Sequence, residues 1–287
     1  MNASPDIALI DMDAPSRDAI AAFFAAIALA AGPVVMREYT RGCAVRAKKD
    51  ASPVTIADEQ AETLILAELR ARASSIPIVA EESVARGAQD AIGPSFILVD
   101  PLDGTREFIA GNGEFTINIA LVRDAAPVAG AVYAPALGRL WFGGEHAFVC
   151  EAAVGAPLPE RSAWRPIETR AAPAEGLVAL ASRSHCDPAT EAFLARLPIG
   201  ERRSAGSSLK FCALAEGLAD VYPRFGPTME WDTAAGDAVL RAAGGAVLAE
   251  DGRPLRYGKI DGQLRNGGFV AWGDPRRAAA ERMLNTT

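Results

Sequence analysis

The sequence predicts an α/β or mixed α+β protein whose helices and sheets stack in layers. Segments with helical character and segments with strand character alternate in both halves of the chain, which is typical of this class. Hydrophobic residues make up 50% of the chain and charged residues 23%, as in an ordinary globular protein with a large core. With 287 residues the chain exceeds one typical core, so we expect two subdomains.

The first half is predicted to begin with a buried helix. Residues 19–36 form an uncharged apolar run with Ser16 as a suitable N-cap, and Gly32 and Pro33 are expected to interrupt it. The run is long enough to span a membrane, but it is rich in alanine and follows several acidic residues, so we predict no membrane insertion. An amphipathic helix is predicted over residues 57–73, and strands over residues 76–80, 96–99, 115–122, 128–133, 140–142 and 147–150.

A weakly periodic stretch rich in Pro, Ala and Arg, residues 151–175, separates the two halves. We therefore expect an N-terminal extension over residues 1–18, a first subdomain over residues 19–155 and a second over residues 156–287. The second subdomain is predicted to contain strands over residues 177–181, 219–222, 245–248 and 269–272, and helices over residues 190–197, 209–216, 232–243 and 275–284.

Charge and cysteine content exclude several functional classes. The 29 Lys and Arg residues against 36 Asp and Glu residues give a net charge of −7, which disfavours nonspecific binding to nucleic acids or anionic membranes. Only two histidines, His146 and His185, are present, too few for a zinc site built on histidine. Because no CxxC motif occurs, reduced thiols in a cytoplasmic protein are expected for Cys43, Cys150, Cys186 and Cys212.

The strongest functional signal is a set of acidic residues at the ends of apolar segments. Glu81 follows one predicted strand, Asp100 and Asp103 follow another on a turn, and Asp232 opens a helix far downstream. Carboxylates at strand ends tend to meet at one edge of a sheet, where they would repel one another unless a cation lay between them. Oxygen ligands favour Mg²⁺ or Mn²⁺ over Zn²⁺. The alternative is that each acid is an unrelated surface cap, and Asp232 alone resembles a helix N-cap.

The residues after Asp103 are suited to bind phosphate. Gly104 and Thr105 begin a segment that can turn helical, so their backbone N–H groups can hold a phosphate oxygen. The Thr105 hydroxyl can orient an attacking water, and Asp58, on the first turn of the helix over residues 57–73, can take its proton through Thr105. The alternative for Asp58 is an acid favoured there by the helix dipole alone.

Five motifs together resemble the inositol monophosphatase superfamily, whose members are lithium-sensitive, Mg²⁺-dependent phosphomonoesterases. Their order and spacing match the family from about residue 20 to the C-terminus, although Ala80 replaces the Gly or Ser common before the acidic pair. The first fifteen residues have no counterpart. The motifs are Lys49-Asp50-Ala51-Ser52-Pro53-Val54-Thr55, Asp58, Glu81-Glu82-Ser83, Asp100-Pro101-Leu102-Asp103-Gly104-Thr105 and Trp231-Asp232-Thr233-Ala234-Ala235-Gly236.

Further motifs resemble the 3′(2′),5′-bisphosphate nucleotidase branch of this superfamily. The resemblance implies hydrolysis of 3′-phosphoadenosine 5′-phosphate (PAP), a by-product of sulfate assimilation, to AMP and phosphate, with 3′-phosphoadenosine 5′-phosphosulfate (PAPS) as a further candidate substrate. The motifs are Arg106-Glu107-Phe108-Ile109, Asn112-Gly113-Glu114-Phe115-Thr116, Ser182-Arg183-Ser184-His185, Gly206-Ser207-Ser208-Leu209-Lys210-Phe211-Cys212 and Tyr222-Pro223-Arg224-Phe225-Gly226-Pro227.

The resemblance also implies a fold and a set of site residues. The fold is a layered αβαβα sandwich with the metal site between the subdomains. Two to three Mg²⁺ ions, for which Mn²⁺ can substitute, are implied, with Asp58 and Thr105 positioning the nucleophilic water. The implied ligands are Glu81, Asp100 and the Leu102 carbonyl for one ion, Asp100, Asp103 and Asp232 for a second, and waters near Glu81 for a third.

A nucleotide with two phosphates also needs cations away from the metals. Lys210 and Arg224 have the right chemistry for the second phosphate, and Ser207 and His185 can donate hydrogen bonds to phosphate or sugar. The alternative for each is a solvated surface residue. Phe211 and Tyr222 are more typical of a core than of a stacking platform for the base.

Three alternatives to this function remain open. The same metal site would serve an inositol monophosphatase or a sugar bisphosphatase, because the metals contact only one phosphate of the substrate. A haloacid-dehalogenase-like phosphatase is suggested by Asp11-Met12-Asp13, but Pro15 breaks that pattern. A non-catalytic PAP sensor would keep Lys210 and Arg224 but could lose the pair Asp58 and Thr105, and the presence of both counts against it. We expect a monomer or homodimer that acts on a small nucleotide in the cytoplasm or at the periphery of the inner membrane.

Overall fold

A seven-stranded sheet forms the centre of the first half of the molecule. The computed structural model describes residues 16–42, 45–47, 53–88, 90–182 and 187–284. The first two strands of this sheet run parallel and every other neighbouring pair is antiparallel. In spatial order the strands are β3 (Ile78–Ala80), β4 (Ser95–Asp103), β5 (Thr116–Arg123), β6 (Ala126–Ala134), β7 (Arg139–Gly143), β8 (Ala147–Glu151) and β9 (Arg165–Ile167).

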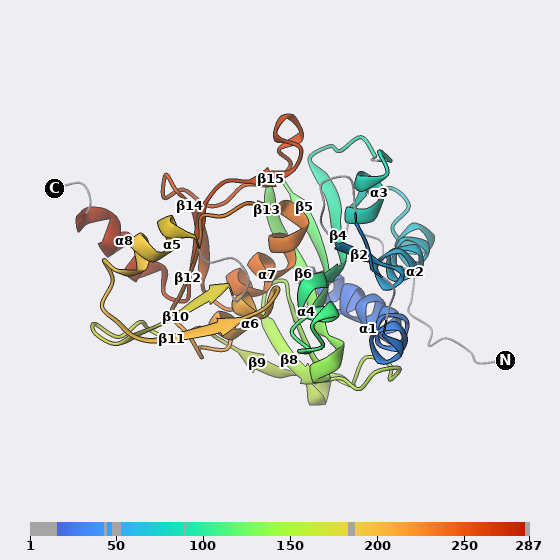
Figure 1. Cartoon of the computed structure of the whole chain (residues 1–287), viewed down its shortest axis with the longest axis horizontal. Helices are drawn as coiled ribbons and strands as arrows, with labels where there is room; N and C mark the ends of the chain where they lie inside the picture. The colour runs from blue at the N-terminus through green and yellow to red at the C-terminus, as the bar shows by residue number, and fades with distance from the viewer. Residues whose placement is uncertain (1–15, 43–44, 48–52, 89, 183–186, 285–287) are drawn as a thin grey trace.

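Helices cover both faces of this sheet (Figure 1). Helices α1 (Arg17–Arg41) and α2 (Ile56–Arg72) pack on one face, and α6 (Leu209–Ala215) and α7 (Glu230–Ala242) pack on the other. Successive residues of a strand point to opposite faces, so Ile97 joins the core under α1 and α2 while Phe96 and Leu98 join the core under α7. Both faces are therefore buried, which explains why the central strands are continuous apolar runs.

A five-stranded sheet lies on the far side of α6 and α7. Its order is β11 (Ile199–Ala205), β10 (Leu177–Ser182), β12 (Val221–Arg224), β16 (Phe269–Trp272) and β14 (Ala246–Ala249). Helices α5 (Pro188–Leu194) and α8 (Pro275–Leu284) cover its outer face. The layers are thus helix, sheet, helix, sheet, helix, and the predicted αβαβα sandwich is confirmed.

Short elements complete the chain and carry much of the site. They are the strand pair β1 (Val45–Ala47) and β2 (Pro53–Thr55), the strand pair β13 (Thr228–Met229) and β15 (Arg265–Asn266), the helices α3 (Glu81–Ala85) and α4 (Thr105–Ile109), and the 3₁₀ turns η1 (Pro135–Leu137), η2 (Arg161–Ala163) and η3 (Ile260–Gly262). Helices α3 and α4 each begin directly at the end of a strand of the first sheet.

The first helix differs from its prediction, because Gly32 and Pro33 do not interrupt it. Helix α1 runs unbroken to Arg41 with Pro33 inside. Burial of its apolar face against the first sheet outweighs the hydrogen bond that proline removes. Gly32 is needed there, since a Cβ at this position would lie 2.7 Å from Cε1 of Tyr133. Helix α1 has the length and hydropathy of a membrane span, but most of its apolar stretch is buried in the core.

Among the residues that the structure describes, six strands lie outside the predicted set: β1, β2, β9, β11, β13 and β15. Strand β11 is the exposed edge strand of the second sheet and has almost no apolar alternation, so no periodic pattern marks it. Strand β9 pairs with β8 and carries the first sheet on to Ile167. The division of subdomains at residue 155 stays a prediction.

Candidate active site

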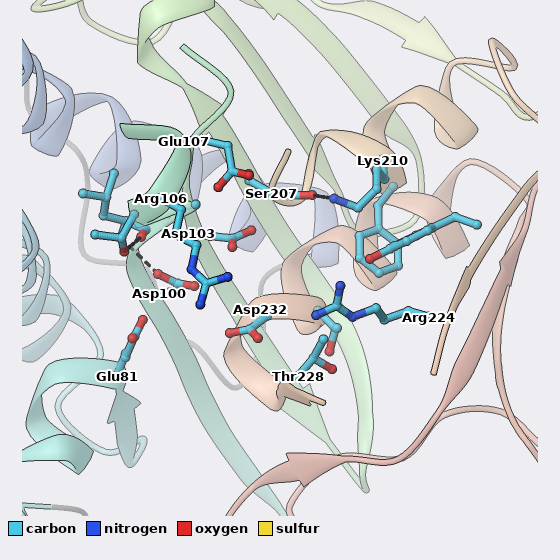
Figure 2. A pocket seen from close by; sticks show the side chains of 16 residues that line it. Glu81, Asp100, Asp103, Arg106, Glu107, Ser207, Lys210, Arg224, Thr228 and Asp232 are labelled. Carbon is cyan, nitrogen blue, oxygen red and sulfur yellow. Dashed lines mark hydrogen bonds between the residues drawn. The ribbon is translucent and has the colours of Figure 1, made fainter. Parts of the chain in front are cut away.

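A pocket of about 260 Å³ lies where the end of β4 meets the beginnings of α3, α4 and α7 (Figure 2). Helix α6 and strand β12 close its other side. The structure brings together ten of the twelve predicted site residues in its lining: Glu81, Asp100, Leu102, Asp103, Gly104, Thr105, Ser207, Lys210, Arg224 and Asp232. Asp58 lies behind Thr105, and His185 falls outside the described residues.

Four acids reach this pocket from three different elements, and we name them together the acidic side. Glu81 is the first residue of α3, Asp100 and Asp103 belong to β4, and Asp232 is the third residue of α7. The sequence predicted a turn after Val99, but β4 continues to Asp103 with a register shift against β5 between Asp100 and Asp103. This irregularity lets both carboxylates of the motif face the same pocket.

Burial and mutual repulsion disturb the titration of the acidic side. Burial raises the pKa of Asp100 well above its ordinary value, and the negative charges of Glu81, Asp103 and Asp232 raise it further. The pKa of Asp232 is raised for the same reasons, with burial again the largest cause. Burial also raises the pKa of Asp103, although the Lys210 ammonium opposes this shift. A positive charge bound among these carboxylates would relieve the repulsion.

The acidic side offers the oxygen ligands that a magnesium site uses, but its carboxylates are not gathered around one point. Among the residues that the structure describes, no group of three or more His, Cys, Asp or Glu side chains is gathered closely enough to hold a metal. Asp100 Oδ1 accepts the Leu102 N–H at 3.0 Å and Asp232 Oδ2 accepts the Met229 N–H at 2.8 Å. The oxygen-only donors and the raised pKa values fit a hard divalent cation, and the individual ligands stay predictions.

Asp58 and Thr105 lie together beside the acidic side. Asp58 Oδ2 accepts the Thr55 N–H at 2.8 Å and the Thr55 hydroxyl at 2.6 Å, which completes a capping box at the start of α2. Its other oxygen, Oδ1, lies 3.4 Å from the Thr105 hydroxyl, and that hydroxyl is also 3.4 Å from the Leu102 carbonyl. Asp58 is therefore both a helix cap and a neighbour of Thr105.

We name Lys210 and Arg224 together the cationic side of the pocket. Burial lowers the pKa of Lys210 to about 8, and its ammonium donates to the carbonyls of Ala205 at 3.1 Å and Ser207 at 2.6 Å. The Arg224 guanidinium donates to the carbonyls of Gly226 at 3.3 Å and Pro227 at 3.1 Å. Both side chains are buried, so neither is the solvated surface residue that the sequence left open.

A loop over residues 206–208 connects the two sides. Glu114 Oε2 accepts the Gly206 N–H at 2.8 Å, and the Ser207 and Thr116 hydroxyls are 2.6 Å apart. Asn118 donates to the Ser208 hydroxyl, which in turn donates to the Asp232 carbonyl at 3.0 Å. These contacts join two of the sequence motifs, residues 112–116 and residues 206–212. Strand β5 and the residues before it hold the loop that carries Ser207.

Sequence reasoning gave no individual role to several residues that line the pocket. Figure 2 shows the Arg106 side chain extending into the pocket toward Asp100 and Asp232, and Glu107 near Ser207. Both directly follow Thr105 on the first turn of α4. Their position next to the segment predicted to bind phosphate is the sequence signal that could have marked them as pocket residues. Phe211 and Tyr222 touch the pocket but pack edge to face, with centroids 5.3 Å apart, in the buried core, as predicted. The other additions are Thr228 and Thr233.

Comparison with known proteins identifies the relatives of this chain. The model of the inositol monophosphatase family matches residues 16–284. The 3′(2′),5′-bisphosphate nucleotidase CysQ of Shigella flexneri is 43% identical over 230 residues, covering 79% of this chain and 89% of that protein. The CysQ of Escherichia coli strain K12 is 42% identical with the same coverage.

Solved structures agree with this relationship. The crystal structure of CysQ from Bacteroides thetaiotaomicron superposes with a TM-score of 0.71 at 41% identity and covers 89% of this chain and 96% of that one. The suppressor protein SuhB from Bartonella henselae gives a TM-score of 0.69 at 26% identity, with coverage of 91% and 96%. CysQ proteins are thus found among the relatives in sequence and among the relatives in structure.

Proposed function

This chain belongs to the inositol monophosphatase family, and from that premise we propose that it is a 3′(2′),5′-bisphosphate nucleotidase that hydrolyses PAP to AMP and phosphate. The observation that carries the proposal is a single pocket with four carboxylates on one side and two buried cations on the other. Such a pocket suits a substrate with two phosphates, one at each side. The identity to proteins named as this nucleotidase supports the same substrate.

Divalent cations are the cofactors that the acidic side suits. We infer that Glu81, Asp100, the Leu102 carbonyl, Asp103 and Asp232 hold two to three Mg²⁺ ions. When bound, such ions supply charge neutralisation and Lewis acidity to the attacking and leaving oxygens of an in-line displacement. The carboxylates contribute by fixing the positions of that charge from three separate elements of the fold.

The pair Asp58 and Thr105 is suited to prepare the attacking water. In the proposal the Thr105 hydroxyl orients a water molecule, and Asp58 Oδ1 takes up its proton through that hydroxyl. The water oxygen then bonds to phosphorus, the bond to the 3′ oxygen breaks, and a proton returns to that leaving oxygen. The second oxygen of Asp58 already accepts two hydrogen bonds from Thr55, which holds the first in a fixed direction.

Recognition of the second phosphate falls to the cationic side. Lys210 and Arg224 supply positive charge, and the loop over residues 206–208 supplies the Ser207 hydroxyl. In the proposal, the backbone N–H groups of Gly104 and Thr105, at the start of α4, bind the phosphate that reacts. His185 stays a predicted contact to phosphate or sugar. Activity on PAPS and inhibition by lithium likewise stay predictions.

The test is phosphate release from PAP and from inositol 1-phosphate, measured side by side with Mg²⁺ and with EDTA. We expect a strong preference for PAP and no release in EDTA. A preference for inositol 1-phosphate would keep the metal site and overturn the substrate. Binding of PAP without phosphate release would overturn the catalytic role and favour a sensor.

A further inference from the structure

Glu62 is a buried acid that is not part of the pocket lining. It lies on α2 one turn after Asp58, and only 1% of its surface is exposed. A buried carboxylate is costly unless hydrogen bonds and charge compensate it, so its surroundings require an explanation. Neither the sequence motifs nor the proposed reaction gives Glu62 a role.

The Glu62 carboxylate accepts four hydrogen bonds, three from the first turn of α3 and one from its C-cap residue Arg86. Its Oε2 accepts the Glu82 N–H at 2.7 Å and the Ser83 N–H at 3.2 Å. Its Oε1 accepts the Ser83 hydroxyl at 2.8 Å and the Arg86 guanidinium at 2.7 Å. All of these donors lie within four residues of one another along the chain, so one side chain holds both ends of this short helix against α2.

Helix α3 depends on this contact because it has no cap of its own. Its N-cap residue is Ala80, which makes no side-chain hydrogen bond, and the helix is only five residues long. The N–H groups at the start of a helix need an acceptor, and here a carboxylate from another helix supplies it. Glu81 is the first residue of α3 and the one that reaches the pocket (Figure 2).

We propose that Glu62 is a positioning residue that fixes Glu81 in the pocket and thereby sets the affinity of the acidic side for a divalent cation. The inference rests on the proposed function, because it assigns Glu81 to metal binding. Groups that orient metal ligands commonly change metal affinity when they are replaced. The same carboxylate links Glu81 to the helix that carries Asp58, so the two groups keep a fixed relation.

The test is the Glu62→Gln variant, compared with Glu68→Gln on the same helix. Glutamine keeps the size of the side chain but has one acceptor oxygen in place of two. Its NH₂ group must therefore face hydrogen-bond donors at one of the two positions that the carboxylate oxygens held. Within the part of the chain that the structure describes, the Glu68 carboxylate pairs with Arg72 one turn away. Its side chain is 38% exposed, so its replacement removes a charge without touching α3. The two variants therefore carry the same chemical change in different surroundings.

Two measurements report on the metal. The first is the MgCl₂ concentration that gives half-maximal PAP hydrolysis, and the second is the rise in Tm caused by MgCl₂ without substrate. For Glu62→Gln we expect the half-saturating Mg²⁺ concentration to rise about tenfold, with kcat at saturating Mg²⁺ within about threefold of the parent. The Mg²⁺-induced rise in Tm should need correspondingly more MgCl₂. Glu68→Gln should match the parent in both.

An unchanged Mg²⁺ dependence in Glu62→Gln, even with a lower Tm in EDTA, would overturn the inference and leave Glu62 as a structural brace. If Glu62→Gln fails to fold, Ser83→Ala is measured in its place, because it removes one of the four donors to the Glu62 carboxylate. We expect this variant to raise the half-saturating Mg²⁺ concentration about threefold. An unchanged value there would overturn the inference. Absence of Mg²⁺-dependent hydrolysis in the parent protein would instead contradict the proposed function.

Discussion

The acidic and cationic sides of the pocket differ in how far the fold itself satisfies their charges. On the cationic side, the carbonyls of Ala205 and Ser207 accept from Lys210, so its charge is already solvated by the protein. On the acidic side, the neighbours of Asp100 include other acids that raise its pKa. The acidic side therefore requires a bound cation, whereas a phosphate at the cationic side competes with contacts that already exist. Metal dependence should be absolute, and recognition of the second phosphate should be graded.

The largest expected effect comes from Asp103→Asn on the acidic side. A neutral ligand in place of a carboxylate weakens the charge stabilisation that the metals give, and a loss of about 4 kcal/mol corresponds to about a thousandfold in kcat. Phosphate release from PAP measures the loss. The Tm in EDTA should be equal or higher, because one repulsive charge has gone; near-normal turnover would contradict the proposed metal ligands.

The next effect is expected from Lys210→Ala on the cationic side. Loss of a charged hydrogen-bond donor should lower kcat/KM for PAP about 10- to 100-fold. The loss for inositol 1-phosphate should stay below about fivefold, because that substrate has no second phosphate. Steady-state kinetics with both substrates check this, with circular dichroism to verify the fold. Equal losses for the two substrates would show that Lys210 serves the loop over residues 206–208 rather than the second phosphate.

Arg106→Gln tests a cation that lies close to the acidic side. Its guanidinium extends toward Asp100 and Asp232, where its charge opposes the binding of Mg²⁺ and favours the binding of phosphate. We therefore expect the half-saturating Mg²⁺ concentration to fall and KM for PAP to rise, each about threefold. Titrations of MgCl₂ and PAP measure the two constants. A change of both constants in the same direction would contradict the two opposite effects assigned to the Arg106 charge.

The smallest expected effect is on stability without metal. Because the pKa values of Asp100 and Asp232 are raised in the folded state, the folded protein binds more protons than the unfolded chain above the ordinary pKa of 3.8. The free energy of unfolding in EDTA should then fall as pH rises. Lys210, with its pKa lowered to about 8, acts in the opposite direction at higher pH, so the comparison belongs below that value.

The measurement is the Tm in EDTA and in MgCl₂ between about pH 5 and 7.5, where the acids dominate. The Mg²⁺-induced difference in Tm should grow with pH, and Asp100→Asn should reduce that growth by a few degrees or less. A difference that is independent of pH would show that repulsion among the carboxylates contributes little to the stability of the metal-free protein.

The acidic side could be predicted from the sequence because its signals are local. Asp100 and Asp103 follow a continuous apolar strand, Glu81 follows another, and Asp232 begins a helix. Each of these positions can be recognised from a few neighbouring residues. The alternation of elements predicts a layered α/β or α+β class, whereas the five-layer sandwich is what the family resemblance implies. The individual metal and substrate roles still await the experiments above.

The remaining features depend on contacts between distant residues. The register shift that lets β4 reach Asp103 depends on pairing with β5, and the passage of α1 through Pro33 depends on packing against the first sheet. The carbonyl partners of Lys210 belong to a loop whose path the sequence does not reveal. Glu62 looked like any polar position of an amphipathic helix, because its partners lie 20 or more residues away.

Two acids of the candidate site, one beside the pocket and one in its lining, also hold the starts of their own helices. Asp58 caps α2 through Thr55, and Asp232 accepts the Met229 N–H before α7. Caps of this kind contribute about 0.5–2 kcal/mol to stability, independently of any reaction. Selection for a stable fold would thus preserve both residues in a descendant that had abandoned catalysis. Retention of Asp58 and Asp232 in a diverged sequence is therefore weak evidence that the sequence still encodes a working enzyme.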